Sequence, residues 1–197
     1  MDFNDTPEEA KFRAEARAWL SKTLGAKAPA ARIDPEGPDA LGPAKAYQAK
    51  KAEAGYVVLT WKKEHGGKEL APIYNVIFQQ EEAKFAAPTG PFSIGLGMCI
   101  PTMIAFASEE QKKRYVTPAL RGEEIWCQLF SEPSAGSDVA GLKTRAVKDG
   151  DDWIINGQKM FTTNAQIGDY VFLLARTNPD VPKHKGLTMF LVPMDQP

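Results

Sequence analysis

The sequence predicts an α+β fold, in which an all-α helical domain over residues 1–123 precedes an incomplete antiparallel β-barrel or β-sandwich domain over residues 124–197. Two observations predict this division. Apolar residues recur at helical spacing, between capping signals, as far as Gly122, and strand-like runs separated by turn signals begin at Ile125. Few strands are made before Pro197, and so short an open sheet would expose an unpaired edge. We therefore expect the sequence to be incomplete.

The first helix is expected from Thr6 to about Leu24. Thr6 can act as the N-cap, Pro7 suits the first helical position, and Glu9 stands three residues after the cap. Gly25 can take the left-handed conformation that ends a helix. The apolar residues of this segment form one stripe at helical spacing, which predicts an amphipathic helix packed on a core: Phe12, Ala16, Trp19, Leu20 and Leu24.

Three further helices are expected before the β-domain. One runs over residues 44–54 and is closed by Gly55, and another begins at Pro72 and ends before Pro88. Ser108 to Gln111 repeats the capping-box pattern, so a helix should follow it and end near Gly122. In the helix after Pro72, four side chains are expected to face the core: Ile73, Val76, Ile77 and Gln80.

The segment from Phe92 to Phe106 is apolar all round, and Gly95, Gly97 and Pro101 interrupt it. Such a segment should be buried and irregularly helical. We expect it to form the wall of an apolar pocket, in which the glycines leave room for a ligand. Close helix packing is the alternative reason for small residues there.

The β-domain is expected to contain strands near residues 125–130, 169–174 and 187–192. Turn signals at residues 148–152 and at Asn156-Gly157 separate apolar runs, as in hairpins.

Composition excludes several classes of function. The 25 acidic and 24 basic side chains give a net charge of -1, so the chain has no electrostatic footprint for nucleic acid or an anionic membrane. No segment reaches the ~18 apolar residues of a membrane span, and the N-terminus lacks a signal-peptide pattern. A cytoplasmic location is expected. Cys99 and Cys127 lie in apolar surroundings without metal-ligand spacing, so we expect buried reduced thiols and no metal site.

The densest local signal runs from Trp126 to Asp138. A strand there enters a loop of small residues, with Gly136 and several hydroxyl and main-chain donors. This pattern suits a planar polar ligand or a phosphate close to the main chain. A polar turn between strands is the alternative.

The residues from Gln128 to Asp138, followed by those from Asn156 to Ala165, resemble the paired signatures of acyl-CoA dehydrogenases. Residues 61–67, 111–115 and 183–188 match the same family in the same order. The resemblance implies a helical domain, a middle β-domain and a C-terminal four-helix bundle, with FAD between the last two. This chain would supply the first domain and about two-thirds of the second.

The resemblance also implies site residues. Those expected to border the flavin are Gln128, Leu129, Phe130, Ser131 and Ser137, and those expected along its ring are Phe161, Thr162 and Thr163. Ser137 matches a position at the thioester end of acyl-CoA, and His184 one near its pantetheine or nucleotide part. For His184, a solvated basic loop is the alternative. Donors at the flavin edges would stabilise negative charge on the reduced ring.

The implied activity is FAD-dependent α,β-dehydrogenation of an acyl-CoA to the trans-2-enoyl-CoA, with electrons passing to an electron-transfer flavoprotein. The resemblance further implies a homo-oligomer, a dimer or a tetramer. The match of Glu132 in the family is structural, and the proton-abstracting glutamate lies beyond Pro197. We therefore expect no catalytic residue in this chain, and no activity from it alone. The alternatives are a non-catalytic truncated or partner subunit, and an acyl-CoA oxidase.

Overall fold

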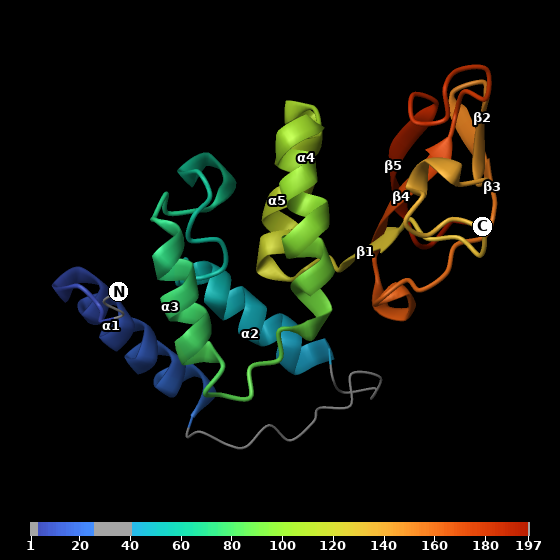
Figure 1. The fold of residues 1–197 in the computed structure, drawn as a ribbon. Helices are drawn as coiled ribbons and strands as arrows, with labels where there is room; N and C mark the ends of the chain where they lie inside the picture. Colours follow the sequence, from blue (N-terminus) through green and yellow to red (C-terminus); the bar gives the residue numbers. More distant parts are fainter. Residues whose placement is uncertain (1–3, 26–40, 197) are drawn as a thin grey trace. The chain divides into compact units, whose positions relative to one another are not determined.

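The computed structural model describes residues 4–25 and 41–196, and the chain divides into two compact units. The helical unit comprises Met1–Ser93 and Thr102–Glu123, and the sheet unit comprises Ile94–Pro101 and Glu124–Pro197. The α+β class is confirmed, since helices fill the first unit and strands the second (Figure 1).

The helical unit contains the expected helices. Both predicted capping boxes form: Thr6 and Glu9 cap α1, and Ser108 and Gln111 cap α5. In each, the N-cap hydroxyl accepts from the backbone N–H three residues on, and the side chain at that position accepts from the N-cap N–H. The helices are α1 Pro7–Leu24, α2 Leu41–Glu53, α3 Pro72–Glu82, α4 Ile100–Phe106 and α5 Glu109–Arg121, with short 3-10 turns η1 Lys63–His65 and η2 Gly90–Phe92.

The core of the helical unit lies between α1, α2 and α3. The predicted α1 stripe is confirmed, because Ala16 and Leu20 are fully buried and its other members pack around them. The predicted inward face of α3 is wrong at Ile73, Val76 and Gln80, which are exposed. Ile77 is buried as predicted, and the other inward positions are Tyr74, Phe78 and Glu81. Aromatic contacts explain this rotation: the Tyr74 ring lies 5.0 Å from Phe12, and Phe78 lies 6.2 Å from Trp19.

The Glu81 carboxylate is fully buried on α3 and is paired with three cations. Arg17 Nε and Nη2 donate to it at 2.9 and 3.1 Å, Lys84 Nζ at 2.6 Å and Arg13 Nη1 at 3.2 Å. The hydrogen bonds from Arg17, and then those from Lys84 and Arg13, outweigh burial and lower the pKa of Glu81 to about 2. This cluster joins α1 to α3 by charge as well as by packing.

The apolar segment is irregularly helical as predicted, because a π-helical turn, η3 Gly95–Cys99, runs directly into α4. Its predicted burial is wrong at Met98, 45% exposed, and at Phe106, 86% exposed. The two glycines have different surroundings. A Cβ at Gly95 would lie 3.1 Å from the Cβ of Trp126, whereas one at Gly97 would meet nothing within 4 Å. Close packing therefore accounts for Gly95 but not for Gly97.

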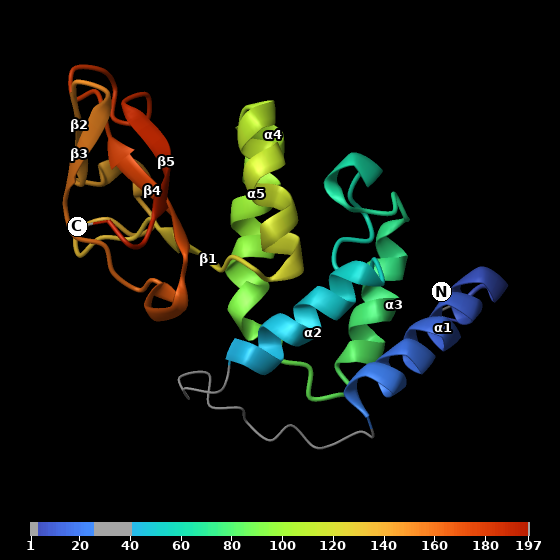
Figure 2. The ribbon, with the colours of Figure 1, turned by 180° about the vertical axis from the view of Figure 1, so that it is seen from behind.

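The sheet unit holds β1 Trp126–Leu129, β2 Arg145–Asp149, β3 Asp152–Asn156, β4 Tyr170–Arg176 and β5 Leu187–Pro193, with short 3-10 turns η4 Val139–Gly141 and η5 Ala165–Ile167. The strand order is β1-β4-β2-β3, and β5 pairs with β4 (Figure 2). Gly150, with φ 61°, closes the predicted turn between β2 and β3.

The sheet is mixed, which corrects the expectation of antiparallel pairing throughout. β2–β3 and β4–β5 are antiparallel, whereas β1–β4 and β2–β4 are parallel. Parallel neighbours need a long connection, and the β2–β3 hairpin with its flanking loops supplies the one between β1 and β4. Both β1 and β2 therefore lie along β4, with β1 beside Tyr170 to Leu173 and β2 at Arg176.

Cys99 and Cys127 are both buried, and neither is in a disulfide. Burial raises the pKa of the Cys99 thiol to about 12 and that of Cys127 to about 11, so both stay protonated. Among residues 4–25 and 41–196, no helix is long and apolar enough to cross a membrane.

Candidate functional site

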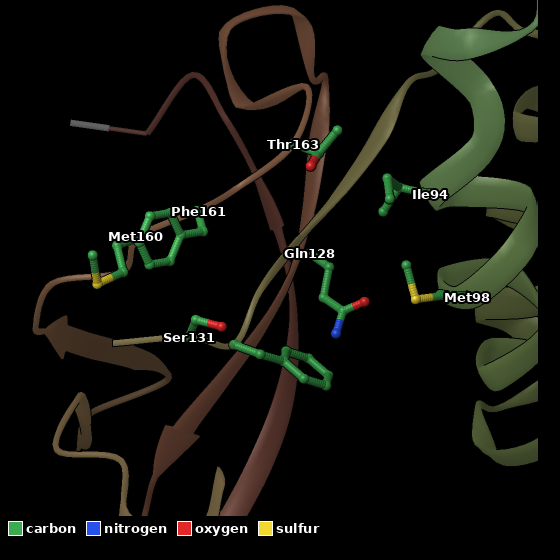
Figure 3. Close-up of a pocket in the computed structure, with 8 residues that line it drawn as sticks. Ile94, Met98, Gln128, Ser131, Met160, Phe161 and Thr163 are labelled. Carbon is green, nitrogen blue, oxygen red and sulfur yellow. The ribbon is translucent and has the colours of Figure 1, made fainter. Parts of the chain in front are cut away.

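A pocket of about 200 Å³ opens in the sheet unit, between the end of β1, the segment after β3 and the π-helical turn (Figure 3). Five of the predicted flavin-site residues line it: Gln128, Phe130, Ser131, Phe161 and Thr163. The remaining wall consists of Ile94, Met98 and Met160. Ile94 and Met98 belong to the apolar segment that was expected to form a pocket wall, and Met160 was not anticipated.

Three predicted flavin-site residues do not line this pocket. Leu129 is half-buried at the end of β1, paired in register with Leu173. Thr162 is half-buried, and its carbonyl oxygen accepts from the Ala165 N–H at 3.3 Å. Ser137 is exposed in the loop that follows β1.

Three polar side chains around the pocket have no hydrogen-bond partner among residues 4–25 and 41–196. No residue in the described parts of the chain hydrogen-bonds to the side chain of Gln128, Ser131 or Thr163. The Gln128 amide projects towards Met98 (Figure 3). Polar groups that line a concave site without a protein partner are suited to a ligand that brings hydrogen-bonding atoms.

Phe161 is held in an unfavourable conformation. Its φ of 55° lies in the left-handed region, which a bulky non-glycine residue seldom adopts, and its side chain is 86% exposed. Exposure of an aromatic ring at a strained backbone position is not explained by the core of the sheet unit. Such outliers collect at ligand sites, where the surroundings enforce them.

Glu132, the residue after Ser131, is buried, and both of its carboxylate oxygens accept hydrogen bonds. It accepts from the backbone N–H groups of Lys143 at 2.6 Å and Thr144 at 2.9 Å, and from Lys159 Nζ at 2.9 Å. Burial alone would raise the pKa of Glu132, but the hydrogen bonds from Thr144, Lys143 and Lys159 outweigh it and lower the pKa to about 2. A carboxylate so fully engaged is suited to holding structure and not to taking up protons.

A second group of predicted residues lies at the loops that follow β1 and β4. Ser137 precedes Asp138, whose carboxylate accepts from Lys183 Nζ at 2.7 Å, and exposed His184 follows Lys183. Arg176, the last residue of β4, donates to the carbonyl oxygens of Ala140 at 2.6 Å and Lys183 at 3.1 Å. The structure thus ties the Ser137 loop to the His184 loop, but neither residue lines the pocket.

The pocket's chemistry fits an isoalloxazine ring. A flavin is planar, with apolar faces and hydrogen-bonding groups along its edge, and the pocket combines apolar walls with partnerless amide and hydroxyl groups. The residue types present therefore suit such a ring, whose polar edge could pair with the amide and hydroxyl groups.

Comparison with known proteins identifies the same family in both units. The family model for the acyl-CoA dehydrogenase N-terminal domain matches residues 6–123, and that for the middle domain matches residues 127–197. The acyl-CoA dehydrogenase IpdE1 of Mycobacterium tuberculosis is 40% identical over 191 residues, covering 95% of this chain and 49% of the relative. FadE29 of the same organism is 38% identical, covering 98% and 48% respectively.

Solved structures agree with this assignment. A steroid acyl-CoA dehydrogenase, Tcur3481-Tcur3483, superposes with a TM-score of 0.80 at 33% identity, covering 99% of this chain and 50% of that one. The ChsE4-ChsE5 complex from Mycobacterium tuberculosis gives the same TM-score and identity over 98% of this chain and 49% of its own. The chain spans about half the length of these relatives. By its two family domains and by these relatives, the chain belongs to the acyl-CoA dehydrogenase family.

Proposed function

We propose that the chain forms the helical domain, residues 1–123, and the β-domain, residues 124–197, of an FAD-dependent acyl-CoA dehydrogenase. The reaction removes two hydrogens from the α- and β-carbons of an acyl-CoA thioester and yields the trans-2-enoyl-CoA. The observation that carries this proposal is the pocket, where Gln128, Ser131 and Thr163 have partnerless polar groups beside the strained ring of Phe161.

The residues that would hold FAD are those on the pocket, with Leu129, Thr162 and Ser137 as flanking contacts. When bound, FAD supplies the acceptor for the hydride that leaves the β-carbon. The chain's own residues would orient the ring: Thr163 and Ser131 would offer hydroxyl groups to its polar edge, and Phe161 would pack along it. Hydrogen bonds aimed at developing negative charge stabilise it most where water is excluded.

The loops that carry Ser137 and His184 are the proposed site for the CoA part of the substrate. The Lys183–Asp138 pair and the Arg176 hydrogen bonds support this assignment, because they hold the two loops together at the end of β4. One solved relative is titled a steroid acyl-CoA dehydrogenase. We therefore include steroid-derived thioesters among the candidate substrates, beside linear acyl chains.

A second candidate is a subunit that completes its flavin site with another polypeptide, which the ChsE4-ChsE5 relative favours because it is titled a complex of two proteins. Purification of the native protein from its source, followed by intact mass of every chain recovered, separates the candidates. A homo-oligomer predicts one mass and a mixed assembly predicts two. An electron-transfer flavoprotein is the proposed electron acceptor, tested against oxygen as acceptor in the same preparation.

The test of the function is dye reduction by the native protein with butyryl-CoA, palmitoyl-CoA and a steroid side-chain CoA, together with release of FAD by denaturation. Thr163→Val should slow flavin reduction about ten- to a hundredfold, the effect of losing a charge-assisted hydrogen bond of roughly 1.5 to 3 kcal/mol. Thr117→Val, on an exposed face of α5, is the matched control. Absence of FAD from the wild-type protein would refute the proposal, and an unchanged Thr163→Val rate would remove Thr163 from the site.

A further inference from the structure

We propose that Glu132 and Lys159 are a positioning pair for the segment Phe161 to Thr163, and that they set its geometry against the bound flavin. The inference rests on the proposed function, since it assumes that this segment faces FAD. Neither side chain lines the pocket, so the pair acts through the segments that it joins.

The pair joins three stretches of chain that are remote in sequence. The Lys159 side chain is 4% exposed, and its Nζ donates to Glu132 Oε1 at 2.9 Å and to the carbonyl oxygen of Phe130 at 3.1 Å. The other oxygen of Glu132 accepts from the Lys143 N–H at 2.6 Å. The end of β1, the approach to β2 and the segment after β3 are thereby fastened to one buried carboxylate.

The residues that follow Lys159 connect the hydrogen-bonded pair to the pocket. The Met160 N–H donates to the Ser131 carbonyl oxygen at 2.9 Å, and Phe161 follows with φ 55°. A strained backbone position persists only when its neighbours leave no alternative. On one side of Phe161 these neighbours are Lys159 and Met160, which are both hydrogen-bonded to residues 130–132.

Close contact before Lys159 restricts the same segment. A Cβ at Gly157 would lie 2.2 Å from Thr144 Oγ1 and 2.7 Å from Thr144 Cα, so only glycine allows the two stretches to approach this far. Thr144 also donates its N–H to Glu132. The segment therefore enters the pocket region between a glycine contact and a buried ion pair.

A contribution to folding stability does not by itself explain the buried Glu132–Lys159 ion pair. Two charges taken out of water lose solvation that their mutual attraction only partly restores, and apolar residues of similar size often serve a fold equally well. The pair restricts geometry, because the carboxylate accepts three hydrogen bonds and the ammonium donates two, and these bonds hold only in few arrangements. A site that must hold a ring to within a fraction of an ångström gains from that restriction.

The experiment measures local order and flavin binding separately in the native protein. Lys159→Met should speed hydrogen exchange of the Met160 amide at least tenfold, while exchange in β4 and β5 stays unchanged. It should also weaken FAD binding at least tenfold and alter the visible circular dichroism of the remaining bound flavin. Lys159→Arg keeps a cationic donor and should restore most of the Met160 protection and of the FAD binding. Lys148→Met changes an exposed lysine on β2 and should leave the exchange and the FAD binding as in wild type.

If Lys159→Met fails to fold, the double variant Glu132→Gln with Lys159→Met tests the positioning role in its place, since it removes both charges together. It should fold, yet retain the fast Met160 exchange and the weakened FAD binding. Normal FAD binding and spectrum in a folded variant would overturn the inference, and so would a double variant that does not fold, because the pair would then serve the fold itself. Wild-type protein without FAD would instead reject the proposed function.

Discussion

Replacement of Phe161 by glycine is expected to stabilise the 197-residue chain while it damages the flavin site. A non-glycine residue in the left-handed region costs about 1–2 kcal/mol, and glycine at the same φ does not bear this penalty. Glycine also makes the unfolded chain more flexible, and this lowers the free energy of unfolding by about 0.5–1 kcal/mol. The Phe161 ring is 86% exposed, so little buried area is lost with it. The expected net gain is between about 0 and 1.5 kcal/mol, or about 0.7 kcal/mol from the midpoints of the two ranges.

Urea unfolding, followed by circular dichroism, measures this change in the free energy of unfolding. Phe161→Ala is the matched control, because alanine removes the ring and keeps the Cβ that makes a positive φ unfavourable. Alanine should leave the free energy of unfolding within about 0.5 kcal/mol of wild type. In the native protein both variants should bind FAD more weakly. If glycine lowers stability more than alanine does, the backbone at Phe161 is not strained and the reasoning fails.

Two other predictions test the pocket wall and the Glu81 cluster. Gly97→Leu in the native protein should lower kcat/KM for palmitoyl-CoA far more than for butyryl-CoA. The melting temperature should not fall, because a Cβ at this position would meet nothing within 4 Å. Equal losses at every chain length would reject the pocket assignment. Glu81 has a folded pKa of about 2 against an ordinary value of 4.5, so its stabilising effect is complete above pH about 4.5 and disappears as the pH falls towards 2. Glu81→Gln should lower stability by roughly 2 kcal/mol at pH 7 and flatten the pH dependence in that window, as urea titrations at each pH would report; a variant as acid-sensitive as wild type would contradict the assignment.

The sequence predicts the helix ends well because the interactions that make them are local. At Thr6 and Ser108 the capping partner stands three residues away, so four consecutive residues of sequence are enough to predict each capping box. The orientation of α3 is different. Which face it buries depends on rings of α1 that contact Tyr74 and Phe78, and the spacing of apolar residues within α3 fits more than one rotation.

Strand pairing shows the same limit. The β2–β3 hairpin follows from the turn at Gly150, because a short turn can join only antiparallel neighbours. The parallel pairing of Trp126 with Tyr170 and of Cys127 with Val171 joins strands far apart in the chain. No pattern within either strand specifies that partner or its direction.

In the candidate site, the family motifs indicate Gln128, Ser131 and Thr163, and the pocket brings these together. They do not indicate Lys159, because a lysine is expected at the surface unless a counter-charge is known to meet it. Its burial depends on Glu132, which the fold supplies from another segment. The useful signal is the pair of motifs taken together, since one contains the carboxylate and the other the ammonium.

The charge of Glu132 also bears on the chemistry proposed beside it. A low pKa keeps Glu132 ionised at neutral pH, and an unpaired carboxylate next to the pocket residue Ser131 would oppose negative charge that develops there during reduction. Lys159 and the two backbone N–H groups meet that charge within 3 Å, so the carboxylate can anchor three segments without this penalty. The partnerless hydroxyl groups of Ser131 and Thr163 then remain available to stabilise the developing charge.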